Sequence, residues 1–184
     1  MDLVKAAREG REAAFLQLFD EHHAPLFRFA YRLTGSVADA EDIVQECFLE
    51  LLRPACLYDP GRTPVRTYLF GVVRNQSLKR RRKGDVAGEA NGDGESRLDA
   101  RHDRSPEAEV LRTELEGAVS RAVMQLPETQ REVLILAHYE QMPLAAIAGV
   151  MALDVGAVKS RLQRARASLK ETLAAYAPGL ERKP

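Results

Sequence analysis

A stretch with very few apolar residues separates two helix-forming halves of this chain, and it limits the folds that the chain can adopt. Residues 84–104 combine several glycines with more acidic than basic side chains. Such a segment buries too little apolar surface to offset the entropy lost on ordering, so we predict a flexible acidic linker over 84–105. Structureless segments of about twenty residues are uncommon inside one compact domain, which predicts two domains, 1–83 and 106–178.

The spacing of apolar residues predicts an all-α fold of two small helical domains. In the first half, apolar residues recur at intervals of three and four from Arg11 to Leu33, as one long helix or two abutting ones. A second helix is expected from Val37 to about Leu52, with Gly35 ending the first helix and Ser36 capping the second. A proline-rich loop and a third helix follow, at 53–64 and 65–83.

The second half is predicted to end in a helix-turn-helix. Helices are expected from Pro106 to about Gln125, from Pro127 to about Tyr139 and from Leu144 to Met151. A tight turn then leads into a basic helix at 155–170, which Asp154 is placed to cap. A short helix, a three-residue turn and a basic helix form the geometry of many DNA-binding domains.

The basic helix at 155–170 carries five cationic side chains and no acid. One apolar stripe, formed by Val158, Leu162, Ala165 and Leu169, is expected to face a core, so the cations are left for the exposed flanks. The alternative is a surface helix whose cations are simply solvated. These residues are the candidates for contacts to nucleic acid: Ala157, Lys159, Ser160, Arg161, Arg164 and Arg166.

Two further charged surfaces are predicted in the first half. Four acids, Asp39, Asp42, Glu46 and Glu50, fall on one side of the second helix, which is either a solvated face or a docking face for a basic partner. The third helix ends in a run of five cations, 79–83. Cations also favour a helix C-terminus, but we prefer nucleic-acid binding.

Neither composition nor motifs point to catalysis. The net charge is zero, and there is no phosphate-binding glycine loop and no metal-binding motif, so we expect no enzyme, cofactor or metal. Two cysteines and no long apolar run predict a soluble cytoplasmic protein. We expect Cys47 to be a buried structural thiol. A zinc site formed by Cys47 and Cys56 with His22 and His23 is the alternative.

Four motifs in order resemble the sigma-70 type RNA polymerase sigma factors, specifically the small extracytoplasmic-function (ECF) group. The chain reads Asp-Ala-Glu-Asp-Ile-Val-Gln-Glu-Cys-Phe at 39–48 and Arg-Asn at 74–75, ahead of the basic run. It then reads Leu-Pro-Glu-Thr-Gln-Arg-Glu-Val-Leu at 126–134 and Val-Lys-Ser-Arg-Leu-Gln-Arg-Ala-Arg at 158–166. The resemblance covers nearly the whole chain.

The resemblance implies partners for both halves. The first half would dock on the clamp helices of the largest subunit of core RNA polymerase, through Asp39, Asp42, Gln45 and Glu46. The second half would contact another polymerase subunit. The linker would thread toward the RNA exit path. An anti-sigma factor is expected to hold the protein inactive.

The resemblance also implies two contacts with promoter DNA. The loop at 53–63 would hold a base flipped out of the minus-ten element. The helix beneath it would supply the minus-ten residues Arg66, Arg74, Asn75 and Arg81. The basic helix at 155–170 would read the minus-thirty-five element.

At several positions the chain departs from the family pattern. Ala146 stands where an acidic residue is usual, and Ala157 replaces a common threonine. Tyr68 stands where the family favours tryptophan. Ala152 stands where the turn commonly has glycine, and a positive φ there would cost roughly 1 kcal/mol.

These features favour a transcription initiation factor that recruits RNA polymerase and selects promoters. One alternative is a stand-alone dimeric regulator that uses the same helix-turn-helix without polymerase. The other is a helical module that binds only proteins, for which the basic flank would be unnecessary.

Overall fold

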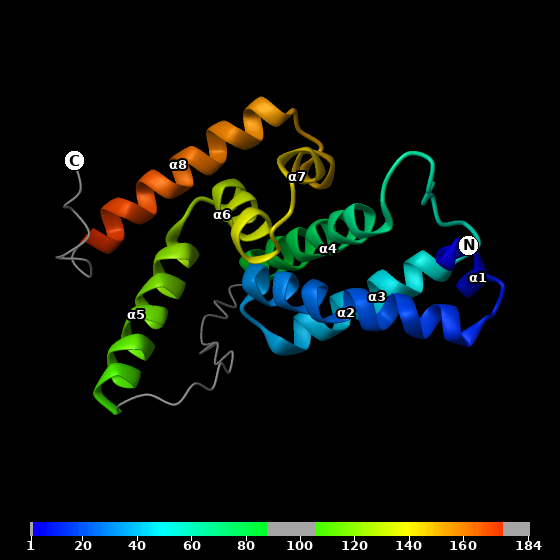
Figure 1. The fold of residues 1–184 in the computed structure, drawn as a ribbon, viewed down its shortest axis with the longest axis horizontal. Helices are drawn as coiled ribbons and strands as arrows, with labels where there is room; N and C mark the ends of the chain where they lie inside the picture. Colours follow the sequence, from blue (N-terminus) through cyan, green and yellow to red (C-terminus); the bar gives the residue numbers. More distant parts are fainter. Residues whose placement is uncertain (1, 88–105, 175–184) are drawn as a thin grey trace. The chain divides into compact units, whose positions relative to one another are not determined.

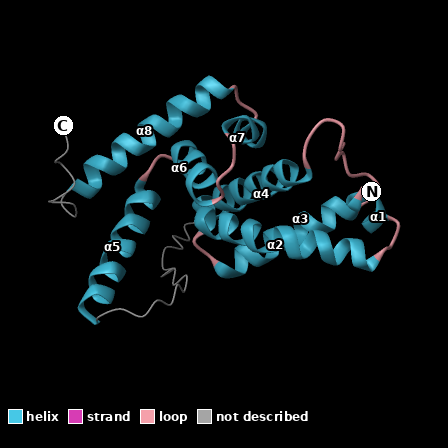
Figure 2. Cartoon of the chain, in the orientation of Figure 1, coloured by secondary structure: helices cyan, strands magenta, loops and turns pink. Residues whose placement is uncertain are grey.

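A computed structural model describes residues 2–87 and 106–174 of the chain. Every regular element in these two ranges is a helix, which confirms the predicted all-α class (Figure 2). The described residues group into two compact units. Unit one contains residues 2–87 together with 135–155, and unit two contains 106–134 together with 156–174.

Four helices form the main body of unit one: α1 (Leu3–Arg8), α2 (Glu12–Thr34), α3 (Val37–Leu52) and α4 (Val65–Ala87) (Figure 1). Helices α2, α3 and α4 all pack on one another, and α1 packs on α2 and α3. Phe29 and Phe70 meet in the core with ring centroids 5.2 Å apart. Both are almost fully buried, as are Ile43 and Leu69, so one apolar cluster holds the three long helices together.

The boundary between α2 and α3 follows the predicted turn chemistry. Gly35 ends α2 with φ 73°, in the left-handed region where glycine has no steric penalty. The Ser36 hydroxyl accepts a hydrogen bond from the Asp39 N–H at 3.2 Å and caps α3. Helix α2 is a single helix that includes Pro25.

Two features of this half differ from the sequence prediction. Helix α1 was not predicted, because six residues are too few for a clear periodicity; the Asp2 carboxylate caps it through the N–H groups of Val4 and Lys5. Helix α4 continues to Ala87, into the start of the predicted linker. The rest of that linker and the predicted cap Ser105 lie outside the described residues.

Residues 135–155 add a π-helical turn, η1 (Ile135–Tyr139), and helix α7 (Leu144–Met151) to unit one. A single helix was predicted up to Tyr139, but the chain changes from α- to π-helical hydrogen bonding at Ile135. Helix α7 packs on α4. The close approach uses Gly149, because an added Cβ there would lie 3.2 Å from the Thr67 methyl group.

Unit two contains α5 (Pro106–Gln125), α6 (Glu128–Leu134) and nearly all of α8 (Val155–Leu173). Arg131 on α6 donates hydrogen bonds to the backbone carbonyls of Met124 and Leu126, which satisfies acceptors at the end of α5. On α8 three of the four predicted core residues, Val158, Leu162 and Ala165, are buried, whereas the fourth, Leu169, is only partly buried. The cations of α8 therefore lie on the remaining surface of the helix.

The turn after α7 contains a strained alanine. Ala152 has φ 52° and ψ 49°, the left-handed conformation in which a Cβ is disfavoured. We predict that Ala152→Gly raises the free energy of unfolding by about 0.5–1 kcal/mol, measured by chemical denaturation. The matched change Ala145→Gly, on the exposed side of α7, should lower it by about 0.5–1 kcal/mol. Destabilisation by both glycines would contradict this interpretation.

Candidate docking and nucleic-acid surfaces

The predicted docking face of α3 is tied to α4 by one arginine. Arg80 Nη1 donates to Asp39 Oδ1 at 3.0 Å and to Asp42 Oδ2 at 3.2 Å, and Nη2 donates to Glu46 Oε1 at 3.2 Å. The three carboxylate side chains are still 39%, 64% and 53% exposed. Gln45 is exposed as well. The structure thus brings together three of the four acids named from the sequence, all except Glu50, and adds a cation among them.

Two opposing effects act on the pKa of Arg80. Partial burial lowers its pKa, but hydrogen bonds to Asp39 and Asp42 and the nearby Glu46 outweigh that effect, so the net pKa shift is upward. Arg80 belongs to the basic run 79–83, which we assigned to nucleic acid. Sequence pattern could not single it out, because only the packing of α3 on α4 decides which cation meets the acids.

Arg66 has a protein partner in this structure. It is exposed, but its Nη2 donates to the backbone carbonyl of Glu140 at 2.8 Å. The Glu140 carboxylate is only 1% exposed and lies 3.7 Å from Arg28 and 3.8 Å from Arg32. Burial raises the pKa of Glu140, and the two arginines oppose that shift. Arg66 is therefore engaged within unit one rather than grouped with the other minus-ten candidates.

A cavity of about 640 Å³ lies where the loop at 53–64 meets α4. Arg74 and Asn75, two of the predicted minus-ten residues, line it. Tyr68 lines it too, and Gly149 and Val150 of α7 form part of the wall together with Ala152 in the turn that follows. The volume is within the range of small-molecule sites in proteins. Arg81, the fourth candidate, lies further along α4 and does not line this cavity.

The candidate minus-thirty-five residues are distributed over the non-core surface of α8. Lys159, Arg164 and Arg166 are exposed, whereas Ala157, Ser160 and Arg161 are partly buried. Arg164 Nη2 donates to Ser160 Oγ at 2.9 Å, one helical turn away. This bond is exposed to solvent and favours one orientation of the Arg164 guanidinium on the free helix.

Comparisons with known proteins decide the family. Residues 18–86 match the profile of Sigma-70 region 2, and residues 116–169 match that of Sigma-70, region 4. The chain is 35% identical over 177 residues to the ECF RNA polymerase sigma factor SigL of Mycobacterium tuberculosis strain H37Rv, with 94% of this chain and 96% of that protein covered. It belongs to the ECF sigma factors of the sigma-70 family.

Other relatives agree with this assignment. ECF sigma factor SigW of Bacillus subtilis is 28% identical over 178 residues, covering 92% of this chain and 94% of SigW. The solved structure of CnrH in complex with the cytosolic domain of CnrY has a TM-score of 0.68 and 27% identity, covering 94% and 96% of the two chains. In the present chain, the region 2 match extends from α2 to α4, and the region 4 match ends within α8.

The zinc alternative does not fit the structure. Among residues 2–87 and 106–174, no three histidine, cysteine, aspartate or glutamate side chains are arranged to hold a metal ion. His22 is buried, and His23 stacks on Phe19 with ring centroids 4.5 Å apart. Both histidines are therefore packing residues of α2. No helix in the same ranges has the length and hydropathy needed to cross a membrane.

The two cysteines of the sigma factor should differ in reactivity. Cys47 is fully buried. Its pKa is raised mainly by this burial and to a lesser extent by the charges of Glu50 and Cys56. Because the thiolate is the reactive form, we predict that iodoacetamide modifies partly exposed Cys56 more than about a hundredfold faster than Cys47 in the native protein. Mass spectrometry of peptides measures both rates, with urea-unfolded protein as the control. Equal rates in native protein would refute the buried-thiol assignment.

Proposed function

We propose that this sigma factor binds core RNA polymerase and directs it to specific promoters, with region 2 and region 4 each supplying part of the contacts. One observation supports the proposal most: both regions have a helix with a charged face at the surface. In region 2 this face is formed by the acids of α3, and in region 4 by the cations of α8. Complementary charge steers association and selects partners. We further propose domains 1–83 and 106–178 with a linker at 84–105, a division that differs from the packing in this structure, where α4 continues to Ala87 and residues 135–155 belong to unit one.

The proposed docking surface consists of Asp39, Asp42, Gln45 and Glu46 on α3. Three of them carry negative charge, and Arg80 neutralises only one of these charges. The face therefore stays net negative and suits a basic helical partner, which we propose to be the clamp helices of the polymerase's largest subunit. Region 4 would contact a second polymerase subunit.

The proposed minus-ten site is the cavity between the loop at 53–64 and α4. An unstacked base needs a pocket and polar groups for its edge, and Arg74 and Asn75 supply donors at the cavity wall. Arg81 and Arg66 are the proposed phosphate contacts. Because α7 also lines this cavity and Glu140 engages Arg66, we propose that these contacts rearrange when DNA binds.

The proposed minus-thirty-five reader is α8. Arg161 and Arg164 can each bind a guanine edge through two hydrogen bonds, and Lys159 and Arg166 can bind phosphates. Ala157 and Ser160 lie at the start of the same helix and would contact base edges or methyl groups.

A partner protein is proposed to regulate this sigma factor. CnrH, the relative described above, was solved with the cytosolic domain of CnrY bound. By analogy, an anti-sigma factor would bind this chain in the cytoplasm. The protein would have no enzymatic activity and would act only through polymerase.

Sedimentation and gel-shift measurements on the pure protein separate this function from that of a stand-alone regulator. The proposal predicts a monomer that binds promoter fragments tightly only when core polymerase is added. A stable dimer that binds a palindromic operator tightly by itself would refute it in favour of the stand-alone regulator.

A further inference from the structure

Three arginines of region 2 surround one glutamate that belongs to the region 4 sequence. Glu140 lies within the region 4 match, but residues 135–155 pack in unit one, where α2 contacts η1. The Glu140 side chain is 1% exposed, and its carboxylate oxygens lie 3.7 Å from Arg28 and 3.8 Å from Arg32, both on α2. Arg66 of α4 donates to the Glu140 backbone carbonyl at 2.8 Å. One segment of region 4 is thus held on region 2 at a basic site.

The Glu140 carboxylate fills this site incompletely. Both ion pairs are longer than a hydrogen bond, and Glu140 Oε1 is buried without a hydrogen-bond partner among the described residues. Three guanidinium groups surround one negative charge, so the site keeps a net positive charge. Arginine binds phosphate through pairs of parallel hydrogen bonds, and a phosphate group offers more acceptor oxygens than a carboxylate. The site therefore suits a phosphate group better than it suits the glutamate.

The arginines of this site can be reached from solvent. The Arg28 side chain is 38% exposed, and Arg66 is exposed as well. The Arg32 side chain is 18% exposed, and its guanidinium lies over the Tyr139 ring, 4.1 Å from the ring centroid. This cation–π contact holds Arg32 beside the other two arginines. A phosphate group can therefore approach the site from outside and displace the glutamate.

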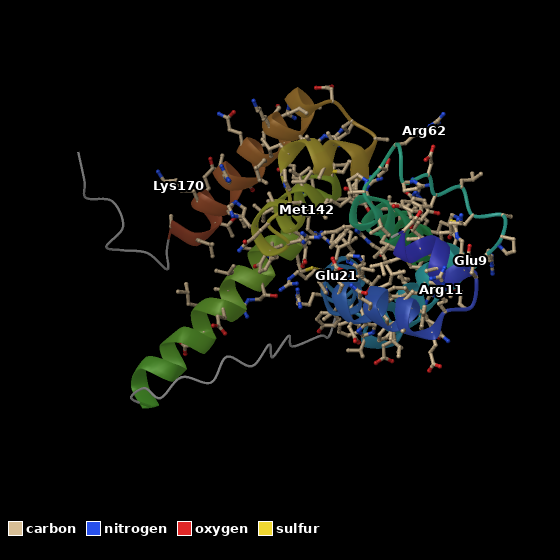
Figure 3. All side chains as sticks on the ribbon, turned by 45° about the vertical axis from the view of Figure 1, so that its right-hand side comes forward. Glu9, Arg11, Glu21, Arg62, Met142 and Lys170 are labelled. Carbon is tan, nitrogen blue, oxygen red and sulfur yellow. The ribbon has the colours of Figure 1, made fainter. Side chains whose placement is uncertain are left out.

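The segment that carries Glu140 is strained on both sides of α7. Gln141 precedes the helix with φ 49°, and Ala152 follows it with φ 52°. Between the π-helical turn and α7, the chain around Met142 lies beside α2 (Figure 3). Left-handed backbone at a residue other than glycine costs energy and persists only where surrounding contacts hold it. The contacts of Glu140 hold this segment on α2, so their loss favours its release.

We propose that Arg28, Arg32 and Arg66 form a phosphate-binding site that Glu140 fills in this structure. A phosphate group and the Glu140 carboxylate compete for the three arginines, and phosphate binding frees residues 135–155 from region 2. The phosphate belongs either to a nucleic-acid backbone or to a free polyphosphate, because both present the same group to the site. The competition needs neither polymerase nor a promoter sequence, so it goes beyond the proposed function.

Binding of tripolyphosphate to the full-length free protein, measured by calorimetry at constant salt, tests the competition. Glu140→Gln removes the competing charge, so we expect it to lower the dissociation constant for tripolyphosphate about tenfold. Arg32→Ala, added to Glu140→Gln, should abolish that gain, whereas Arg121→Ala at an exposed position on α5 should leave it intact. Glu12→Gln removes the same charge at an exposed position about 24 Å from Arg28 along α2, and should keep wild-type affinity because salt screens so distant a charge.

Hydrogen exchange of the wild-type protein gives a second readout that depends on no variant. Saturating tripolyphosphate should speed exchange of the backbone amides of α7 at least about tenfold, because the segment leaves α2 and α4. The same measurement with a single-stranded oligonucleotide identifies the source of the phosphate. Release of α7 at a lower phosphate concentration by the oligonucleotide supports the site with nucleic acid as its ligand, and the reverse order supports it with a free polyphosphate.

Two results would overturn the proposal. One is Glu140→Gln with wild-type affinity for tripolyphosphate, or with a gain that survives Arg32→Ala, because Glu140 would then only neutralise nearby cations. The other is unchanged exchange of α7 in wild-type protein saturated with both phosphate compounds, a result that holds even if Glu140→Gln does not fold. Failure of the proposed function looks different, because it appears only in experiments with core polymerase, which is absent here.

Discussion

Charge reversal of the docking face, Asp42→Lys with Glu46→Lys, is expected to raise the dissociation constant for core RNA polymerase at least about a hundredfold. Both carboxylates are more than half exposed on α3 and face outward from the three-helix core. Two new cations would meet a basic partner, and like charges brought together at an interface cost several kcal/mol. Fluorescence anisotropy of labelled sigma factor, titrated with core enzyme without DNA, measures the change.

Arg80 makes a second variant necessary. The new lysines would also repel Arg80, so the charge reversal could act by loosening α3 from α4. Exposed ion pairs contribute about 0.2–1 kcal/mol each, so thermal unfolding should shift only slightly. Arg80→Ala removes the same pairs without adding charge to α3, and it should keep polymerase affinity within about threefold.

The matched control places two lysines at exposed acids outside the docking face, Asp20→Lys on α2 with Glu114→Lys on α5. This variant changes the net charge by the same amount and should bind polymerase nearly as wild type does. An equal loss in the control would mean that only overall charge matters. Intact binding by the Asp42 and Glu46 variant would remove α3 from the interface.

The second large effect is expected in sequence discrimination by α8. Arg161→Ala and Arg164→Ala should each reduce the preference for one base pair of the minus-thirty-five element by about 1–3 kcal/mol, which is roughly five- to 150-fold. Arg164 is already oriented by its 2.9 Å bond to Ser160. Competition binding by polymerase carrying each variant, against promoters changed at one position at a time, measures the loss.

Lys159→Ala is the control for the two arginine variants. A lost phosphate contact should weaken binding to all promoters alike and flatten the dependence of log affinity on log salt concentration by about one unit. If the arginine variants also weaken every promoter equally, they bind the backbone, and base readout by Arg161 and Arg164 is wrong.

Local chemistry made much of this fold predictable. The left-handed Gly35, the Ser36 cap and the buried stripe of Val158, Leu162 and Ala165 depend on neighbouring residues alone, and each was predicted. The short helix α1 and the π-helical turn at Ile135 gave no periodic signal. The sequence predicted a tight turn at Ala152 but not its positive φ, because the local pattern does not determine the backbone angles of the turn.

The unpredicted contacts at the sites depend on residues that are distant in sequence. Arg80 meets acids 34 to 41 positions away, and Arg66 meets Glu140 at a separation of 74. No spacing rule selects Arg80 from five consecutive cations. Packing of α4 against its neighbours decides both contacts.

Transcription in vitro tests the central claim most directly. Core RNA polymerase, alone or with this protein, is incubated with a library of genomic fragments, and the 5′ ends of the transcripts are sequenced. We predict start sites that require the protein and share a minus-ten and a minus-thirty-five element at constant spacing. If adding the protein produces no start sites beyond those of core enzyme alone, it is not a promoter-selecting initiation factor.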